Sequence, residues 1–384
     1  MGSLSNFVLR NEQNKELKII LSEYWGEIQA RLFPYLCVQV EEPLTAKLEQ
    51  VVRILEIVRV ESCVPCPFGR WSGRPAHDRR RLARAFVVKS VYDLPTTESL
   101  IELLRYHRSL RLFCGWEGRS DIPSASTFSR SFAEFAEAGL GDQVHGALVS
   151  EHVGKQIVMH ASRDSTEVVA RERVAKKVKR PKEKKKRGRP KSGEERPAPE
   201  PKRLDVQLNQ SADEALGALP RVCDFGTKMD TSGHKHTWKG WKAHIDWADG
   251  NIPINVVTTS ASVHDSQLAI PMARRTAERV TSLYDLMDSA YDAPQIRQVS
   301  EELGHVAIID PNPRRGGVPE DKLFDPVTAR RYQERTTAER GNSRLKDEFG
   351  LRHLRVRGHS KAHLHIMFGV IALFADQLLK PWSG

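Results

Sequence analysis

The chain has 384 residues, of which 60 are basic and 49 acidic, so its formal net charge is +11 at neutral pH. Five cysteines are too few, and an odd number, for a disulfide scaffold, and no run of about 18 apolar residues predicts a membrane span. No apolar segment follows a basic start, so we expect a cytoplasmic protein of two or three domains, whose positive charge favours an anionic partner.

The first 152 residues are predicted to form a mostly helical region, because apolar residues recur there at helical spacing. Helices are expected at residues 77–92, 96–106 and 124–136. The second and third of these could form a helix-turn-helix with a long turn. Thr127, Ser129 and Arg130 would then face a DNA groove. An ordinary helical bundle is the alternative.

The whole formal charge excess lies in one stretch, residues 171–203. It contains 16 lysines and arginines, 5 acidic residues and five prolines, with almost no large apolar side chains. Such a segment cannot bury a core, so we predict a disordered basic insertion at about 171–220. Its middle, Arg187-Gly188-Arg189-Pro190, resembles an AT-hook, whose arginines enter the narrow minor groove of A·T-rich DNA. A solvated linker that binds phosphates without sequence preference is the alternative, and both interpretations favour a nucleic-acid partner.

Residues 153–384 are predicted to form an α/β domain around this insertion. Strands are expected at residues 156–161, 241–247, 252–259, 282–287 and 305–309. Helices are expected at residues 266–279, 294–303 and 331–349. The resulting order is strand, strand, strand, helix, strand, helix, strand, helix. It predicts a mixed five-stranded sheet flanked by helices.

Three carboxylates are candidate metal ligands. Asp164 follows the first predicted strand, Asp288 follows the fourth, and Glu339 projects from the last helix. Carboxylates from separate elements can hold two hard divalent cations such as Mg²⁺, which polarise the attacking and leaving oxygens in phosphodiester cleavage. Each of these residues taken alone is more often a surface charge.

The last predicted helix carries a polar face. Tyr332, Arg335, Glu339 and Lys346 stand at offsets of 0, 3, 7 and 14. At about 100° per residue, all four share one narrow side of the helix. A helix that packs on a core normally turns an apolar stripe towards it, so this face favours contact with an anion. The alternative is a solvated salt bridge from Arg335 or Lys346 to Glu339 or Glu334.

The spacing Tyr-x2-Arg-x3-Glu-x6-Lys on this helix resembles the signature of bacterial insertion-sequence DDE transposases. Asp288-Ser289-Ala290-Tyr291-Asp292 resembles the region of that family's second catalytic aspartate, and Asp164-Ser165-Thr166 resembles that of the first. Val263-His264-Asp265-Ser266 is similar to the family's turn after the third strand. Segments at residues 73–75 and 122–128 are similar to its helical DNA-binding region.

The likeness covers most of residues 70–375 and implies an RNase H-like catalytic domain that cleaves element ends and transfers strands with Mg²⁺, for which Mn²⁺ can substitute. It implies that Asp164 bridges two ions, and that Asp288 and Glu339 each complete one of them. Arg335, Lys346 and Tyr332 would hold the DNA near the scissile bond.

The partners that the resemblance implies are double-stranded DNA, as the element's terminal inverted repeats and as the target, and a second copy of the chain. Joining two ends requires at least a dimer in the DNA complex. The protein would then be bacterial and nucleoid-associated. Two alternatives remain: a catalytically inactive, sequence-specific DNA-binding protein, and a metal-dependent nuclease of the same fold.

Overall fold

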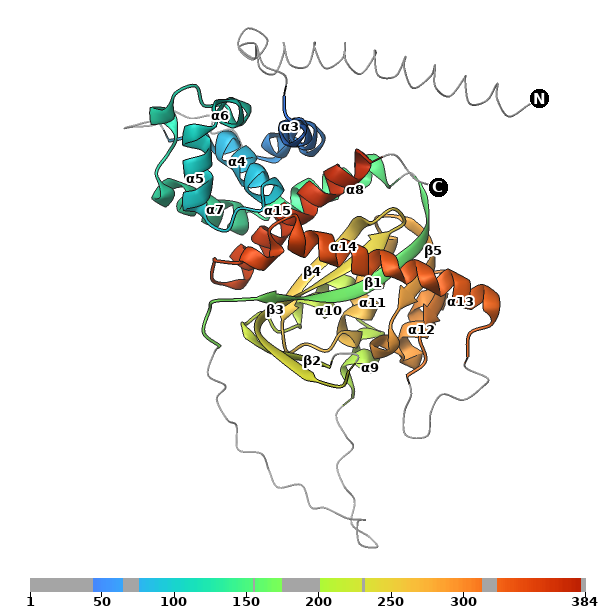
Figure 1. The fold of residues 1–384 in the computed structure, drawn as a ribbon. Helices are drawn as coiled ribbons and strands as arrows, with labels where there is room; N and C mark the ends of the chain where they lie inside the picture. Colours follow the sequence, from blue (N-terminus) through green and yellow to red (C-terminus); the bar gives the residue numbers. More distant parts are fainter. Residues whose placement is uncertain are drawn as a thin grey trace, which may run out of the picture.

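The computed structural model combines a group of helices with a six-stranded sheet (Figure 1). It describes residues 44–64, 76–154, 156–174, 201–229, 232–312 and 323–380. The AT-hook-like segment with Arg187 and Arg189 lies outside these residues, as do most of the basic insertion and the segment at 73–75.

The described residues before the sheet are organised into helices. These are α3 (Ala46–Val58), η1 (Val60–Cys63), α4 (Arg79–Val91), α5 (Thr97–Tyr106), α6 (Arg108–Cys114), η2 (Arg119–Asp121), α7 (Ala125–Glu137) and α8 (Leu140–His152). Helix α6 stands between α5 and α7, and Thr127 is buried. Of the residues that the helix-turn-helix alternative would turn towards a groove, Thr127 is buried, whereas Ser129 and Arg130 are exposed; the helices pack together as a bundle. Phe86 of α4 packs edge-on against Phe128 and Phe132 of α7.

The sheet is mixed and contains one strand more than the five expected. Its strands are β1 (Ile157–Val169), β2 (Asp224–Met229), β3 (Lys235–Ala248), β4 (Ile252–Ser260), β5 (Thr281–Met287) and β6 (Val306–Ile309). β3 pairs antiparallel with β1, β2 and β4, whereas β1, β5 and β6 run parallel. The strand that the sequence did not reveal is β2, because its residues show no apolar alternation and its two large apolar residues, Phe225 and Met229, are exposed.

Helices accompany the strands in the second half of the chain. They are α9 (Arg203–Gln207), α10 (Ala212–Gly217), α11 (Ser266–Ala277), η3 (Ser289–Tyr291), α12 (Pro294–Glu302), α13 (Pro326–Tyr332), η5 (Gln333–Arg335), α14 (Thr336–Asp347), η6 (Leu351–His353) and α15 (His359–Leu378). α9 and α10 lie within the segment that we expected to be disordered, so the predicted end of the insertion at about residue 220 is wrong. Leu204 and Leu216 pack into small apolar clusters with residues of α11.

Two neighbouring residues of β1 are linked to helices on opposite faces of the sheet, Arg163 through Asp246 and Asp164 directly. Arg163 donates to both carboxylate oxygens of Asp246 on β3, at 2.7 and 3.0 Å, and Thr276 of α11 donates to the same carboxylate. Asp164 instead accepts a 2.9 Å hydrogen bond from Asn342 of α14. Because successive strand residues alternate between faces, α11 and α14 cover opposite sides of the sheet.

Helix α15 joins the bundle to the sheet. It contacts α3, α4, α7 and α8 on one side and β4 on the other, and Figure 1 shows it running between the two parts. Its buried residues belong to a single apolar core that continues from the helices into β3 and β4. In the part of the chain that the structure describes, no helix combines the length and apolar character needed to cross a membrane.

Candidate active site

A cavity of about 420 Å³ lies beside β1, and both carboxylates and lysines line it. Its walls include Asp164 of β1, Lys228 of β2, Lys242 of β3, Asp265 after β4, Asp288 after β5 and Lys346 of α14. Three of the residues predicted from the sequence, Asp164, Asp288 and Lys346, therefore meet here although they come from distant segments. The cavity is the candidate active site.

Parallel pairing of β1 with β5 places Asp164 beside Asp288. The ladder pairs Ser162 with Leu286, and the two aspartates stand two residues further along their strands. A two-residue step returns to the same face, and neighbouring strands are about 4.8 Å apart, so both carboxylates flank one spot. Asp164 was expected just past the end of its strand. β1 in fact continues to Val169, so Asp164 lies within it.

The two aspartates resist ionisation in the absence of a ligand. Burial raises the pKa of Asp164 to about 6; nearby Lys228 opposes the rise and Asp288 adds to it. Burial also raises the pKa of Asp288, although its carboxylate accepts a 2.9 Å hydrogen bond from the Ala290 backbone N–H. Bringing a cation to such a pair would favour the charged carboxylates.

Asp265 adds a third aspartate to the cavity wall, but it is already paired. Lys242 Nζ donates to its carboxylate at 2.9 Å. Burial opposes ionisation of Asp265, yet His244 and Lys242 together lower its pKa below the ordinary value. Tyr291 is buried close by, and among the described residues its hydroxyl has no hydrogen-bond partner. A buried donor without a partner beside carboxylates fits a site that a bound, oxygen-rich ligand completes.

The polar helix face predicted from the sequence is present, although the helix at 331–349 is divided into α13, η5 and α14. Arg335 Nη2 contacts Glu339 Oε1 at 2.6 Å, and the Arg335 guanidinium lies 5.7 Å from the centre of the Tyr332 ring. Burial opposes the charge on Arg335, but Tyr332, Asp164, Glu339 and Asp288 together raise its pKa above the ordinary value. Arg335 therefore lies within electrostatic reach of all three predicted carboxylates.

Comparison with known protein families identifies two domains. Residues 218–375 match the family described as transposase DDE domain, and residues 38–134 match a transposase domain of the family DUF772. Residues 218–375 are therefore similar to a DDE transposase domain. The six-stranded sheet and its helices fit the RNase H-like fold of such a domain, and the two matches support a transposase function that implies DNA binding. No curated protein matches the chain.

The match to the DDE domain includes Asp288, Glu339 and Lys346 but begins after Asp164. In the sequence, β1 precedes the basic insertion and β2 follows it. In the sheet, both strands pair with β3. The insertion therefore separates Asp164 in sequence from the matched part, while strand pairing returns it to the same sheet.

Glu339, the third predicted carboxylate, does not line the cavity in this structure. Its side chain is 56% exposed and is held by Arg335, which is the salt bridge that the sequence left open as an alternative. Within the described ranges, no group of three or more histidine, cysteine or acidic side chains could hold a metal ion. Asp164 and Asp288 are thus brought together, whereas Glu339 is paired with Arg335, which all three carboxylates influence electrostatically.

Asn342 is a residue of this site that the sequence reasoning missed. Its Nδ2 donates to Asp164 at 2.9 Å, while its buried Oδ1 has no partner among the described residues. It follows Glu339 by three residues and therefore shares the polar face of α14. The helical offset could have revealed it, but an uncharged amide does not stand out beside charged neighbours. Lys228 was missed because β2 was missed.

The other predicted DNA contacts lie elsewhere. Arg130 is exposed on α7, where its Nε donates to the Ser126 carbonyl at 3.4 Å, and it does not line the cavity. Lys346 lines the cavity, and its Nζ lies 3.8 Å from a Glu167 oxygen. Arg187 and Arg189 fall outside the described residues.

Gly341 lets α14 lie close against the sheet, and Gly341→Ala should reveal how tightly. A Cβ atom at this position would come within 2.5 Å of the buried Trp247 ring on β3. We expect Gly341→Ala to lower the free energy of unfolding by about 1–3 kcal/mol in urea titrations. Gly146→Ala in α8 is the matched control, because its Cβ meets nothing within 4 Å. If the two variants were equally stable, the space between α14 and Trp247 would be large enough for an alanine Cβ, and the prediction would be wrong.

Asp164 should make the stability of the protein depend on pH. Its pKa is about 6 in the fold against 3.8 ordinarily, so the folded state binds this proton more tightly than the unfolded state does. The stability that the protonated carboxyl contributes is present below pH 4 and is lost as the pH rises through 6. Without divalent cations, Asp164→Asn should therefore be more stable than wild type above pH 6, by on the order of 2 kcal/mol. Thermal melts in chelator across this range measure it, and a constant difference at every pH would contradict the prediction.

Proposed function

We propose that the chain is the transposase of an insertion sequence, and that it cleaves the ends of its element and joins them to target DNA. The observation that carries the proposal is the register of β1 with β5, which sets Asp164 beside Asp288 of the segment that matches a DDE domain. Both line a cavity that also contains Lys228, Lys242 and Lys346. Paired carboxylates among lysines suit a reaction on a phosphodiester.

The aspartate pair fits a hard divalent cation such as Mg²⁺ or Mn²⁺. Both residues offer carboxylate oxygens, which such cations prefer as ligands. Both have raised pKa values, so a nearby positive charge would favour their ionised forms. The Tyr291 hydroxyl close by has no hydrogen-bond partner among the described residues. A bound cation would supply Lewis-acid polarisation of the phosphodiester oxygens. Glu339 would complete the ligand set with Asp164 and Asp288 after its carboxylate leaves Arg335.

The remaining groups of the site hold and orient DNA in this proposal. Once freed from Glu339, Arg335 would pair with a phosphate next to the scissile bond, and Lys346 would do the same because its contact with Glu167 is long. Tyr332 would stack on or bond the backbone. The reaction, attack by water and then by the freed 3′ hydroxyl, needs in-line positioning and charge stabilisation rather than a covalent intermediate with the protein.

The proposed partners are the element's inverted repeats, target DNA and a second copy of the chain, since two ends must be held for joining. Arg187 and Arg189 in the insertion and Arg130 on α7 are proposed as contacts to the duplex outside the cavity. Such contacts add phosphate neutralisation and therefore make binding sensitive to salt.

Glu339→Gln tests the proposal most sharply. A labelled duplex that carries the repeat flanking the gene is incubated with wild type and Mg²⁺, and nicked and strand-transfer products are separated on a denaturing gel. We expect both products with wild type and a loss of at least about 100-fold with Glu339→Gln, which is about 2.7 kcal/mol of barrier. Glu334→Gln is the matched control, because this exposed neighbour is not one of the three proposed metal ligands and should leave cleavage unchanged.

A DNA-binding protein that has lost catalysis is a second candidate, and the Arg335–Glu339 pair favours it because that pair keeps the third carboxylate out of the cavity. Binding of the repeats by wild type without cleavage would establish this candidate. Cleavage of unrelated duplexes without strand transfer would instead point to a nuclease of the same fold.

A further inference from the structure

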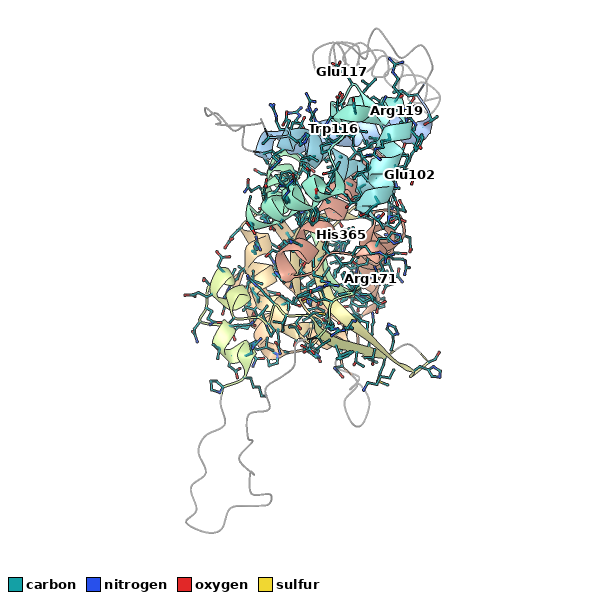
Figure 2. The ribbon with its side chains drawn as sticks, turned by 90° about the vertical axis from the view of Figure 1, so that its left-hand side faces the viewer. Glu102, Trp116, Glu117, Arg119, Arg171 and His365 are labelled. Atoms are coloured by element: carbon teal, nitrogen blue, oxygen red, sulfur yellow. The ribbon has the colours of Figure 1, made fainter. Side chains whose placement is uncertain are left out.

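A second, smaller cavity lies where the helical bundle meets the DDE domain. Its volume is about 100 Å³. Its polar lining residues are Lys89 of α4, Thr96 and Thr97 at the start of α5, Ser129 of α7, and His353, Arg355, Lys361 and His365 from η6 to α15. We call it the basic groove. Figure 2 shows His365 midway along the molecule, on the helix that passes between the bundle and the sheet. No acidic side chain lines it among the described residues.

Two cations of the basic groove lack negative partners among the described residues, whereas its His353 lies 3.5 Å from a carboxylate oxygen of Asp93. Neither Arg355 nor Lys361 forms an ion pair with any residue that the structure describes, and Arg355 is exposed. Lys89 Nζ donates only to the Leu94 carbonyl, at 2.7 Å. Burial lowers the pKa of Lys89 to about 8; Asp93 opposes this and Arg355 adds to it. Three cationic side chains thus converge where a bound anion would relieve their repulsion.

The floor and the size of the groove indicate what kind of anion fits. Phe86, Phe128 and Phe132 form an apolar floor, next to which charge interactions are less screened than in water. A water molecule occupies roughly 30 Å³ in the liquid, so the groove holds about three of them. That is room for one phosphate group.

We propose that the basic groove binds one backbone phosphate of duplex DNA. The proposal rests on the function proposed above, from which it takes DNA as the source of the phosphate. Lys89 and Ser129 belong to residues 38–134, whereas Arg355 and Lys361 belong to residues 218–375, so both matched transposase domains contribute to the groove. A phosphate held there fixes the duplex to the bundle and to the catalytic domain at the same time.

The test compares two double variants of the full chain with equal charge changes. Arg355→Gln/Lys361→Gln removes two cations of the groove, and Arg53→Gln/Arg105→Gln removes two exposed cations from α3 and α5. Fluorescence anisotropy follows binding to a labelled duplex of random sequence in chelator over a series of salt concentrations, because backbone contacts carry no sequence information. We expect at least tenfold weaker binding and a salt slope reduced by about one for the groove variant, and less than threefold change for the control.

Equal losses for the two variants would overturn the proposal, because they would reflect net charge alone, and so would unchanged binding by the groove variant. A melting series with inorganic phosphate separates the two sources of the anion. If free phosphate stabilises wild type but not the groove variant, and DNA binding is unaffected, the groove binds free phosphate and the DNA assignment is wrong. Circular dichroism checks the fold, and the single variant Arg355→Gln at its exposed site repeats the test. Because chelator prevents metal-dependent cleavage, the result is independent of whether the chain cleaves DNA.

Discussion

Asp288→Asn is expected to abolish cleavage of element ends while leaving their binding nearly unchanged, and Asp164→Asn is expected to do the same. Each substitution removes one of two carboxylates that the parallel strands hold side by side, and an amide is a poor ligand for a hard divalent cation. We expect the single-turnover cleavage rate to fall at least about 1,000-fold, which corresponds to about 4 kcal/mol of barrier. Quenched-flow or gel assays with Mg²⁺ measure the rate, and anisotropy measures binding.

Asp310→Asn is the matched control for this pair. Asp310 follows β6, the next parallel strand beside β5, but it does not line the cavity. The same change at the end of a neighbouring strand should therefore leave cleavage within about twofold of wild type. If either Asp164→Asn or Asp288→Asn cleaved at the wild-type rate, that residue would be removed from the site.

The largest effect on stability is expected from Asp246→Ala. Arg163 is 1% exposed, and its guanidinium is held by both oxygens of Asp246, so the substitution would leave a buried charge without its counter-ion. Thr276 would lose its acceptor as well. We expect the free energy of unfolding to fall by about 3–5 kcal/mol, measured by urea titration. Because Arg163 precedes Asp164 on β1, the register of β1 against β3 should loosen too, and hydrogen exchange would detect this.

Two comparisons separate this prediction from a general effect of removing charge. Arg352→Ala breaks a 2.7 Å ion pair with Asp347 in which both side chains are about half exposed, and it should cost less than about 1 kcal/mol. The double variant Arg163→Met/Asp246→Leu should recover most of the lost stability, because apolar groups of similar size replace the buried pair. If Asp246→Ala and Arg352→Ala lowered the free energy of unfolding equally, burial would not be what makes the Arg163–Asp246 pair important, and the prediction would be wrong.

The sequence predicted five of the six strands because their apolar runs reflect burial in a sheet. β2 escaped because its two large apolar residues, Phe225 and Met229, are exposed, so its sequence does not record burial; it is held as a strand by hairpin pairing with the first half of β3. The Arg163–Asp246 pair could not be predicted either. Charged residues are normally expected at the surface, and only the pairing of β1 with β3 shows that these two neutralise each other.

The candidate site was predictable in part. Helical spacing correctly predicted that Arg335, Glu339 and Lys346 share one face, because that follows from backbone geometry. It could not predict which partner each side chain takes. Glu339 bonds to Arg335 rather than lining the cavity, and Asn342 contacts Asp164 in a way that depends on how closely α14 approaches the sheet. Such choices depend on side-chain packing and local charge, which a one-dimensional pattern does not record.

The position of α15 has a consequence for how the protein is made. The bundle helices and the sheet share one apolar core to which this helix contributes extensively, and each described element that it packs against precedes it in the chain. During synthesis the bundle therefore has no complete core until the ribosome has passed the catalytic residues. A chain that stops before α15 would present an incompletely packed bundle. Completion of the bundle is thereby tied to completion of the part of the chain that carries Asp288 and Glu339.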